Sequence, residues 1–295
     1  MSLSLTVELA EMVCRFEHFG CGTFCDSWQW KLDTYRSASS DEGRYDIIFR
    51  NQKKEEEIPD PIRKVYEIQD GFFLRTVSVL PGGGTLWRCV RKLSGEALLS
   101  YAVNHTWSEI VLVEDRSVTA GQMAFEYLGH IFPACGLMKD MLTFHGVLLE
   151  YSGYGLIISA PSGTGKTTHA RLWRDRKRAL IINGDRAACR KKDGIWTGFG
   201  IPWSGTSGEQ INRSVPIKAV VVLERGGENC AFRITEQEAF GAVLPHVQCP
   251  AWDAQLTGRM LGLLDDFLRN IPVIRLRCLP DGEAVDVLAK AVEDL

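Results

Sequence analysis

A lysine and two threonines follow a glycine-rich segment near the middle of the chain. Residues 160–168 read Ala-Pro-Ser-Gly-Thr-Gly-Lys-Thr-Thr. Backbone N–H groups of such a loop can point at an anion, and the N-terminus of a following helix adds partial positive charge. Lys166 would reach the terminal phosphates of a nucleotide, and the Thr167 hydroxyl would bind Mg²⁺.

This segment predicts a phosphate-binding loop (P-loop) of the Walker A type, with Ala160 in place of the usual first glycine. An ordinary Gly/Ser turn with a solvated lysine is the simpler alternative, but it leaves the Gly-Lys-Thr-Thr run at a helix start unexplained. The residues expected to hold phosphate are Ser162, Gly163, Thr164, Gly165, Lys166, Thr167 and Thr168.

A carboxylate and a histidine are further candidates for chemistry. Phosphoryl transfer needs a phosphate cradle, a metal ligand and a group that orients or deprotonates the acceptor. Asp185 follows the predicted strand 179–183, and ligands of open α/β sheets bind beyond the carboxyl ends of strands. Asp185 could therefore hold Mg²⁺ or accept a proton, or it could be a simple turn cap. The role of His145 stays open between structural and functional, and Arg186 and Arg213 are candidate phosphate partners.

The elements that must position these residues can be read from hydrophobic patterning. An apolar run at 156–158 predicts a buried strand directly before the loop, and a helix is expected over 167–175. Spacing over 117–144 predicts a helix with a break near Pro133. Because strands and helices alternate after this point, we expect an α/β domain over 117–295.

The first 116 residues are predicted to form a β-rich domain. Residues 65–79 favour a hairpin around Asp70-Gly71, and later strands follow at the spacing of an antiparallel sheet. Trp28 and Trp30 would share one strand face, and the charged run 53–57 is expected to be a solvated loop.

Composition excludes several function classes. The net charge of −3 gives no general attraction to nucleic acid or to an anionic membrane. No apolar stretch is long enough for a transmembrane helix and the start of the sequence has no signal-like core, so a cytoplasmic location is expected. The nine cysteines include no C-x-x-C pair, which favours reduced, mostly buried thiols over a zinc site.

Residues 145–168 resemble the corresponding stretch of HPr kinase/phosphorylase, which also has a His-Gly strand, a Gly-x-Gly hairpin and a Ser-Gly-x-Gly-Lys loop. The loop also resembles that of ATP-dependent phosphoenolpyruvate carboxykinase, which shares the fold. Residues 183–186 and 200–205 resemble a bacterial branch of HPr kinase-like proteins associated with peptide-modification clusters. The resemblance covers about residues 140–225 well, and it does not extend to the first 115 residues.

The resemblance implies a C-terminal P-loop domain of HPr kinase/phosphoenolpyruvate carboxykinase type with a mixed sheet, preceded by a β-rich (α+β) N-terminal domain. It implies an ATP/Mg²⁺-dependent kinase that phosphorylates a hydroxyl, such as a serine of a peptide, a protein or a free small molecule. Pyrophosphate is an alternative donor. Lys166, Asp185 and His145 would be catalytic, and Thr167 and Asp185 would bind the metal.

This sequence departs from both families at one position. They carry two adjacent acids where this chain has Gly184-Asp185, so one carboxylate would have to serve two roles unless Glu209 compensates. The missing acid supports an alternative, a non-catalytic nucleotide-binding accessory protein of a peptide-modification pathway. A carboxykinase-type lyase is a third hypothesis. A homo-oligomer is compatible with the sequence, and the first domain is open between substrate recognition, scaffolding and dimerisation.

Overall fold

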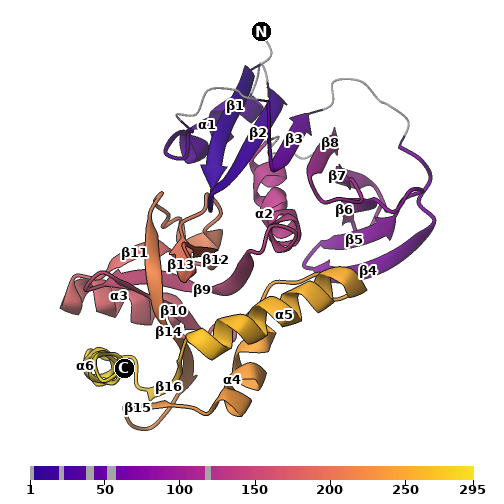
Figure 1. Cartoon of the computed structure of the whole chain (residues 1–295). Coiled ribbons are helices and arrows are strands. Elements are labelled where there is room, and N and C mark those ends of the chain that lie inside the picture. Colours follow the sequence, from indigo (N-terminus) through magenta and orange to yellow (C-terminus); the bar gives the residue numbers. More distant parts are fainter. Residues whose placement is uncertain (1–2, 20–22, 38–42, 52–57, 117–120) are drawn as a thin grey trace. The chain divides into compact units, whose positions relative to one another are not determined.

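The computed structural model of the chain describes residues 3–19, 23–37, 43–51, 58–116 and 121–295 (Figure 1). The described chain divides into two compact units, Met1–Lys139 and Asp140–Leu295. This division falls later than the expected boundary near residue 117, because helix α2 (Gln122–Leu137) packs within the first unit. The Tyr101 hydroxyl, for example, donates to the Ala124 carbonyl of α2.

The first unit is built on one eight-stranded sheet, in the order β1-β2-β3-β8-β7-β6-β5-β4. Its strands are β1 (Leu3–Leu9), β2 (Met12–Phe19), β3 (Ile47–Asn51), β4 (Arg63–Asp70), β5 (Phe73–Val79), β6 (Thr85–Arg91), β7 (Ala97–Val103) and β8 (Glu109–Asp115). The expected hairpin at Asp70-Gly71 is confirmed, since β4 pairs antiparallel with β5 across Gly71 at φ +59°. The later strands β6, β7 and β8 pair antiparallel as expected, whereas β3 pairs parallel with both β2 and β8.

Two helices of the first unit differ from the sequence-based expectations. Trp28 and Trp30 lie in helix α1 (Thr23–Asp33) and not on a strand, so residues two apart point in different directions. Trp28 is buried and Trp30 is 62% exposed. In α2 the expected break near Pro133 is absent, and Pro133 lies within the helix. The expected charged loop 53–57 lies outside the described residues.

The second unit also contains an eight-stranded sheet, and it carries four helices within its described range, 140–295. The strands are β9 (Leu142–Tyr151), β10 (Tyr154–Ser159), β11 (Leu180–Asn183), β12 (Arg186–Lys192), β13 (Ile195–Phe199), β14 (Ser214–Arg225), β15 (Cys230–Arg233) and β16 (Val273–Cys278). The helices are α3 (Lys166–Lys177), α4 (Glu236–Val243), α5 (Ala254–Asn270) and α6 (Glu283–Glu293).

The pairing of this sheet partly closes on itself. The path runs β10-β9-β12-β13-β14-β16-β15, and β10 also pairs parallel with β14. β11 and β12 both pair antiparallel with β9, at Leu148–Glu150 and Leu142–His145 respectively. The sheet is therefore mixed, as expected, and residues Gly184 and Asp185 lie at the join between β11 and β12.

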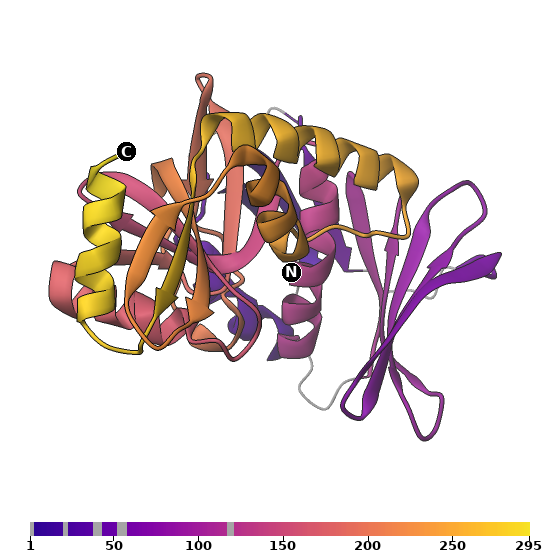
Figure 2. The same cartoon turned by 90° about the horizontal axis from the view of Figure 1, so that it is seen from below.

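Helices cover both faces of this sheet (Figure 2). Helices α3 and α6 pack on one face, where Trp173 of α3 and Leu288 of α6 join a core that includes Leu156 and Ile158 of β10. On the other face Phe267 of α5 packs against Phe144 of β9 and Trp196 of β13. Because β10 is buried on both sides, its apolar run is continuous and not alternating. In the described ranges, no helix is long and apolar enough to cross a membrane.

Local sequence signals fix several ends of elements near the site. Asp193 (φ +49°) and Gly194 (φ +81°) form the tight turn between β12 and β13, as expected. Thr235 and Glu238 form a capping box at the start of α4, which is also confirmed. The predicted phosphate-binding segment lies between β10 and α3, in the strand–loop–helix order that the sequence predicts.

Candidate functional site

The register of the central strand β9 brings the predicted site residues together. Across one edge of β9, His145 lies opposite Arg186 of β12. Across its other edge, Gly146 lies opposite Ser159, the last residue of β10. The Ser159 hydroxyl donates to the His145 carbonyl oxygen (2.7 Å), and the Gly146 amide donates to the Asp185 carbonyl oxygen (2.9 Å). Asp185 and the start of the loop therefore flank the same short piece of β9.

The loop between β10 and α3 contains two glycines in a backbone conformation that favours glycine. Gly163 (φ +77°) and Gly165 (φ +120°) adopt positive φ angles that side chains with a Cβ rarely take. Gly165 immediately precedes α3, so the free N–H groups of the first helical turn belong to residues 166–168. Ser162, Gly163 and Thr168 are exposed, and the residues between Thr164 and Thr167 are partly exposed. The predicted phosphate-holding residues are thus open to a ligand.

Lys166 folds back over the loop. Its ammonium group donates to the Ala160 carbonyl oxygen (2.8 Å) and lies 3.5 Å from that of Pro161. Burial lowers the pKa of Lys166, and the negative charge of Asp185 partly offsets this effect. The ammonium group and the Asp185 carboxylate are therefore close enough to interact electrostatically.

Asp185 is held in place by a buried asparagine. Asn183 lies at the end of β11 and is fully buried. Its side-chain oxygen accepts the amides of Asp185 (3.0 Å) and Arg186 (2.8 Å), and its amide group donates to the Ile201 and Trp203 carbonyl oxygens. This Asx-type turn rotates the chain out of the strand, which accounts for the Asn-Gly-Asp-Arg pattern.

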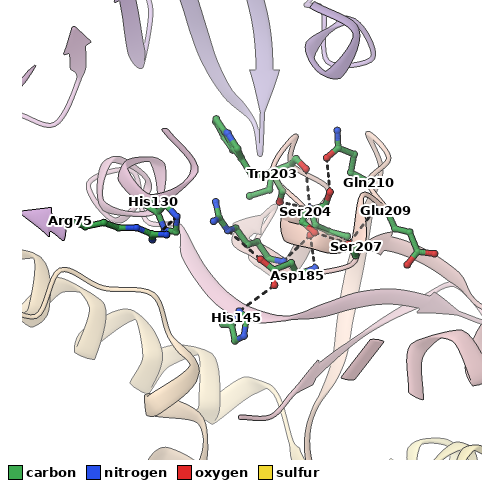
Figure 3. A network of polar contacts seen from close by, with 12 residues as sticks. Arg75, His130, His145, Asp185, Trp203, Ser204, Ser207, Glu209 and Gln210 are labelled. Carbon is green, nitrogen blue, oxygen red and sulfur yellow. Dashed lines mark hydrogen bonds and ion pairs between the residues drawn. The ribbon is translucent and has the colours of Figure 1, made fainter. Parts of the chain in front are cut away.

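The carboxylate of Asp185 has longer-range partners. Its oxygens lie 3.5 Å from His145 Nδ1 and 3.6 Å from Nε of the buried Arg186 (Figure 3). It also packs on Gly205, where an added Cβ would lie only 2.6 Å from the Asp185 carboxyl carbon. This close approach explains the glycine that ends the 200–205 segment.

Gly184, where the resembled families carry their first acid, has no room for a side chain. A Cβ there would lie 2.1 Å from Ser207 Oγ and 2.6 Å from Ser207 Cβ. Ser207 Oγ donates to the Ser204 carbonyl oxygen (2.6 Å) and accepts the Glu209 amide (3.3 Å), so it is itself fixed. Ser207 therefore occupies the space that a second carboxylate would need.

Glu209 does not replace the missing acid in this arrangement. One carboxylate oxygen accepts from Arg174 of α3 (2.8 Å), and Figure 3 shows the Glu209 side chain pointing away from Asp185. Its backbone carbonyl accepts the Gly184 amide (3.0 Å). Glu209 thus contributes to positioning the loop through its backbone and an ion pair.

His145 is largely uncharged at neutral pH. Partial burial lowers its pKa below the usual 6.5, and the positive charges of Lys166 and Arg186 act in the same direction, while Asp185 opposes them. A neutral imidazole can accept or donate a hydrogen bond beside the carboxylate.

A second histidine was not found by sequence reasoning. His246 ends the 3-10 helix Leu244–His246, and the next two residues pair with β9: Val247 bridges Phe144, and the Gln248 amide donates to the Thr143 carbonyl oxygen (2.8 Å). His246 therefore lies where β10 ends along β9. Burial lowers the pKa of His246, and the charges of Lys166 and His145 act in the same direction. Only a contact between segments a hundred residues apart could have revealed it.

The two arginines that were candidate phosphate partners lie in different parts of the second unit. Arg186 lies in the site beside Asp185. Arg213 instead makes a two-pronged ion pair with Glu150 at the far end of β9 (Nη2–Oε1 2.7 Å), so it does not face the loop. Arg225, at the end of β14, is an unpredicted neighbour: its guanidinium donates to the Gly163 carbonyl oxygen (2.6 Å).

A magnesium ion beside Asp185 would have few protein ligands. No cluster of three or more histidine, cysteine or acidic side chains suited to a metal occurs among the described residues. Mg²⁺ commonly uses only one or two carboxylates and completes its shell with water and substrate phosphates. Asp185 offers one such carboxylate, and Thr167, whose hydroxyl the sequence assigns to Mg²⁺, lies in the first turn of α3.

Comparison with known proteins gives limited information. No protein-family model and no curated protein matches the chain. Among solved structures, the HPr(Ser) kinase/phosphatase from Coxiella burnetii is a weak neighbour, with a TM-score of 0.30 and 11% sequence identity. The match covers 52% of this chain and 88% of that one. The likeness is a distant one.

Proposed function

We propose that the second unit binds a magnesium–nucleotide complex on the loop 162–168 and transfers its terminal phosphoryl group to a hydroxyl. The observation that carries this proposal is the convergence of Lys166, Asp185 and His145 beside a loop with left-handed glycines. A lysine, a carboxylate and a phosphate cradle are the parts that phosphoryl transfer requires.

The side chains would divide the work as follows. The Lys166 ammonium group would leave the Ala160 carbonyl oxygen and donate to phosphate oxygens instead. Its positive charge would then stabilise the negative charge on the phosphoryl group that is transferred. Asp185 would accept the proton of the acceptor hydroxyl, whose oxygen forms the new bond to phosphorus while the bond to the leaving diphosphate breaks. Mg²⁺, held by Thr167 and Asp185, would supply charge neutralisation on the phosphate oxygens.

Asn183 and His145 would position Asp185 to accept this proton. Asn183 fixes the backbone of Asp185 by accepting its amide, and the neutral His145 lies 3.5 Å from the carboxylate. The acceptor that we propose is a serine hydroxyl of a peptide, a protein or a free small molecule.

One observation favours a second candidate, a nucleotide-binding accessory protein without turnover. Ser207 fills the space beside Gly184, so Asp185 is left as a single acid. If one carboxylate cannot both bind the metal and accept the proton, the site would bind nucleotide without transferring phosphate.

The Asp185→Asn variant tests the first candidate against the second. We expect wild-type protein to transfer label from γ-labelled ATP to serine-bearing peptides, scored by mass spectrometry. Asp185→Asn should lower this rate by about 10²-fold or more, as for loss of a general base, while nucleotide still binds.

Asp193→Asn is the matched control, since Asp193 lies in the exposed turn between β12 and β13 and should leave the rate unchanged. A wild-type rate in Asp185→Asn would remove Asp185 from catalysis. Nucleotide binding without transfer to any peptide would favour the accessory protein.

A further inference from the structure

His246 lies beside the residues proposed to act on the phosphate, but it is not one of them. It ends the 3-10 helix Leu244–His246, and the following residue, Val247, forms an antiparallel bridge with Phe144 of β9. The same register places His246 opposite His145. Residues directly opposite each other in an antiparallel pair have Cβ atoms about 4.5–5.5 Å apart, on the same face of the sheet. The register therefore brings the two histidines side by side.

The position of His246 along β9 is also the point at which β10 ends and the phosphate-holding loop begins. β10 pairs with the same edge of β9 as far as Ser159, which lies opposite Gly146. The next residue, Ala160, accepts the Lys166 ammonium group on its carbonyl oxygen (2.8 Å). Successive strand residues are only about 3.3 Å apart along the strand. A phosphate bound by Lys166 in place of this carbonyl would therefore lie next to His246.

The backbone holds His246 in place, and its ring has no partner within the protein. The Val247 amide closes the 3-10 turn by donating to the Leu244 carbonyl oxygen (3.1 Å), and the Gln248 amide donates to the Thr143 carbonyl oxygen (2.8 Å). His246 is only 9% exposed, yet among the described residues its ring makes no hydrogen bond or ion pair. Buried polar groups nearly always have a partner. The ring is therefore available to a ligand, and replacing it removes no hydrogen bond of the fold.

His246 is largely uncharged at neutral pH. Burial lowers its pKa below 6.5, and the charges of Lys166 and His145 act in the same direction. A neutral imidazole keeps one N–H donor and one acceptor nitrogen. His246 can therefore donate a hydrogen bond to a phosphate oxygen without first taking up a proton.

We propose that His246 is a catalytic residue, whose ring N–H donates to an oxygen of the terminal phosphoryl group while that group passes to the acceptor hydroxyl. The proposal rests on the proposed function of the loop 162–168 and Asp185. The acceptor oxygen forms the new bond to phosphorus as the bond to the leaving nucleoside diphosphate breaks, and the acceptor proton goes to Asp185. His246 keeps its own proton and stabilises the negative charge on the phosphoryl oxygens.

Substitution of His246 separates the transfer step from nucleotide binding. A donor that acts on the charge of the transition state raises kcat and contributes little to binding of the ground state. Loss of one such donor typically lowers kcat by about 10²–10³-fold. His246→Ala should therefore lower transfer from γ-labelled ATP to serine-bearing peptides by about 10²-fold. The Kd of Mg²⁺-ATP, measured by calorimetric titration, should stay within threefold of the wild-type value.

Two conservative variants test the N–H donor itself. His246→Gln and His246→Asn each keep an N–H group, at different distances from the backbone. At least one of them should transfer phosphate ten times faster than His246→Ala.

Binding of Mg²⁺-ADP with aluminium fluoride gives a second readout, because the fluoride complex takes the place of the phosphoryl group in transfer. His246→Ala should weaken this binding at least tenfold. The matched control is His105→Ala, since His105 is exposed in the turn between β7 and β8 of the first unit. It should leave the transfer rate and both affinities unchanged.

A wild-type rate in His246→Ala would remove His246 from catalysis. An equal loss of rate in the alanine, glutamine and asparagine variants, or a parallel loss of Mg²⁺-ATP affinity, would contradict donation by the ring N–H and indicate a structural role. In each of these cases, transfer by the wild-type protein would keep the proposed function in place. Absence of transfer by the wild-type protein would instead overturn the proposed function, and the role of His246 with it.

Discussion

Replacing Gly184 by alanine tests whether Ser207 leaves room for a side chain beside Asp185. The new Cβ would lie 2.1 Å from Ser207 Oγ and 2.6 Å from Ser207 Cβ, closer than real Cβ contacts. Ser207 cannot move away freely, because its hydroxyl is hydrogen-bonded to the Ser204 carbonyl and the Glu209 amide. An added side chain must therefore displace the 204–209 segment or the end of β11.

The loss in the free energy of unfolding caused by Gly184→Ala can be estimated from this geometry. Overpacking in a tight site typically destabilises by about 1–3 kcal/mol, and alanine recovers about 0.4–1 kcal/mol by restricting the unfolded chain. We expect a net loss of roughly 1–2 kcal/mol for Gly184→Ala. In a Ser207→Gly background both close contacts vanish, so the same substitution should cost less than about 0.5 kcal/mol, a coupling of about 1 kcal/mol or more.

Urea unfolding of the four proteins in this cycle measures the coupling, followed by tryptophan fluorescence. Trp173, Trp196 and Trp203 are buried in the second unit and report on it. Ser207→Ala is an informative control, since it removes the 2.1 Å contact but keeps the one at 2.6 Å, and should relieve only part of the loss. A neutral Gly184→Ala, or an equal cost in both backgrounds, would refute the steric explanation.

Two further predictions concern the histidines near the loop. The positive charge of Lys166 lowers the pKa of both His145 and His246. Lys166→Ala should therefore raise the pH midpoints of both ring-proton titrations in NMR spectra. Unchanged midpoints would show that Lys166 does not act on either histidine. The pKa of His169 is about 4 in the folded protein and 6.5 in the unfolded chain. The unfolded chain therefore takes up a proton first, and the free energy of unfolding, which is at its full value above pH 6.5, decreases as the pH falls towards 4. His169→Gln should remove up to about 3 kcal/mol of this acid destabilisation, as measured by urea unfolding at each pH, and an unaltered pH profile would contradict the assignment.

The sequence was informative where the relevant interactions are local. The strand–loop–helix order around residues 160–168, the turn at Asp193-Gly194 and the capping box at Thr235 each depend on a few consecutive residues, and all three were predicted. The interaction of Asp185 with Lys166 agrees with the sequence analysis, which placed Asp185 at the carboxyl end of a strand and therefore beside the loop that carries Lys166.

Other features depend on pairings between distant segments. His246 reaches the site because Val247 bridges Phe144, a contact that no local pattern encodes. Gly184 is visible in the sequence, but the side chain that leaves no room there belongs to Ser207, more than twenty residues later. The parallel pairing of β3 likewise has no local signal, since strand direction is set by the chain connections around it.

Errors also arose where tertiary packing outweighed local propensity. The spacing of Trp28 and Trp30 fits one face of a strand, yet the segment is helical, and Trp28 is buried against Phe16 and Phe125. Pro133 would be expected to interrupt a helix, but α2 continues through it with the surrounding residues buried. Burial of these apolar side chains stabilises helices that propensity alone disfavours.

Calorimetric titration of wild-type protein, Lys166→Ala and Lys191→Ala with Mg²⁺-ATP tests the central claim most directly. Lys191 is the control, because it pairs with Asp266 on the surface, away from the loop. A charge-assisted contact contributes roughly 1.5–3 kcal/mol, so Lys166→Ala should weaken saturable binding at least tenfold and Lys191→Ala should not alter it. Equal affinity of all three proteins, or no saturable binding by the wild type, would contradict a nucleotide site at this loop.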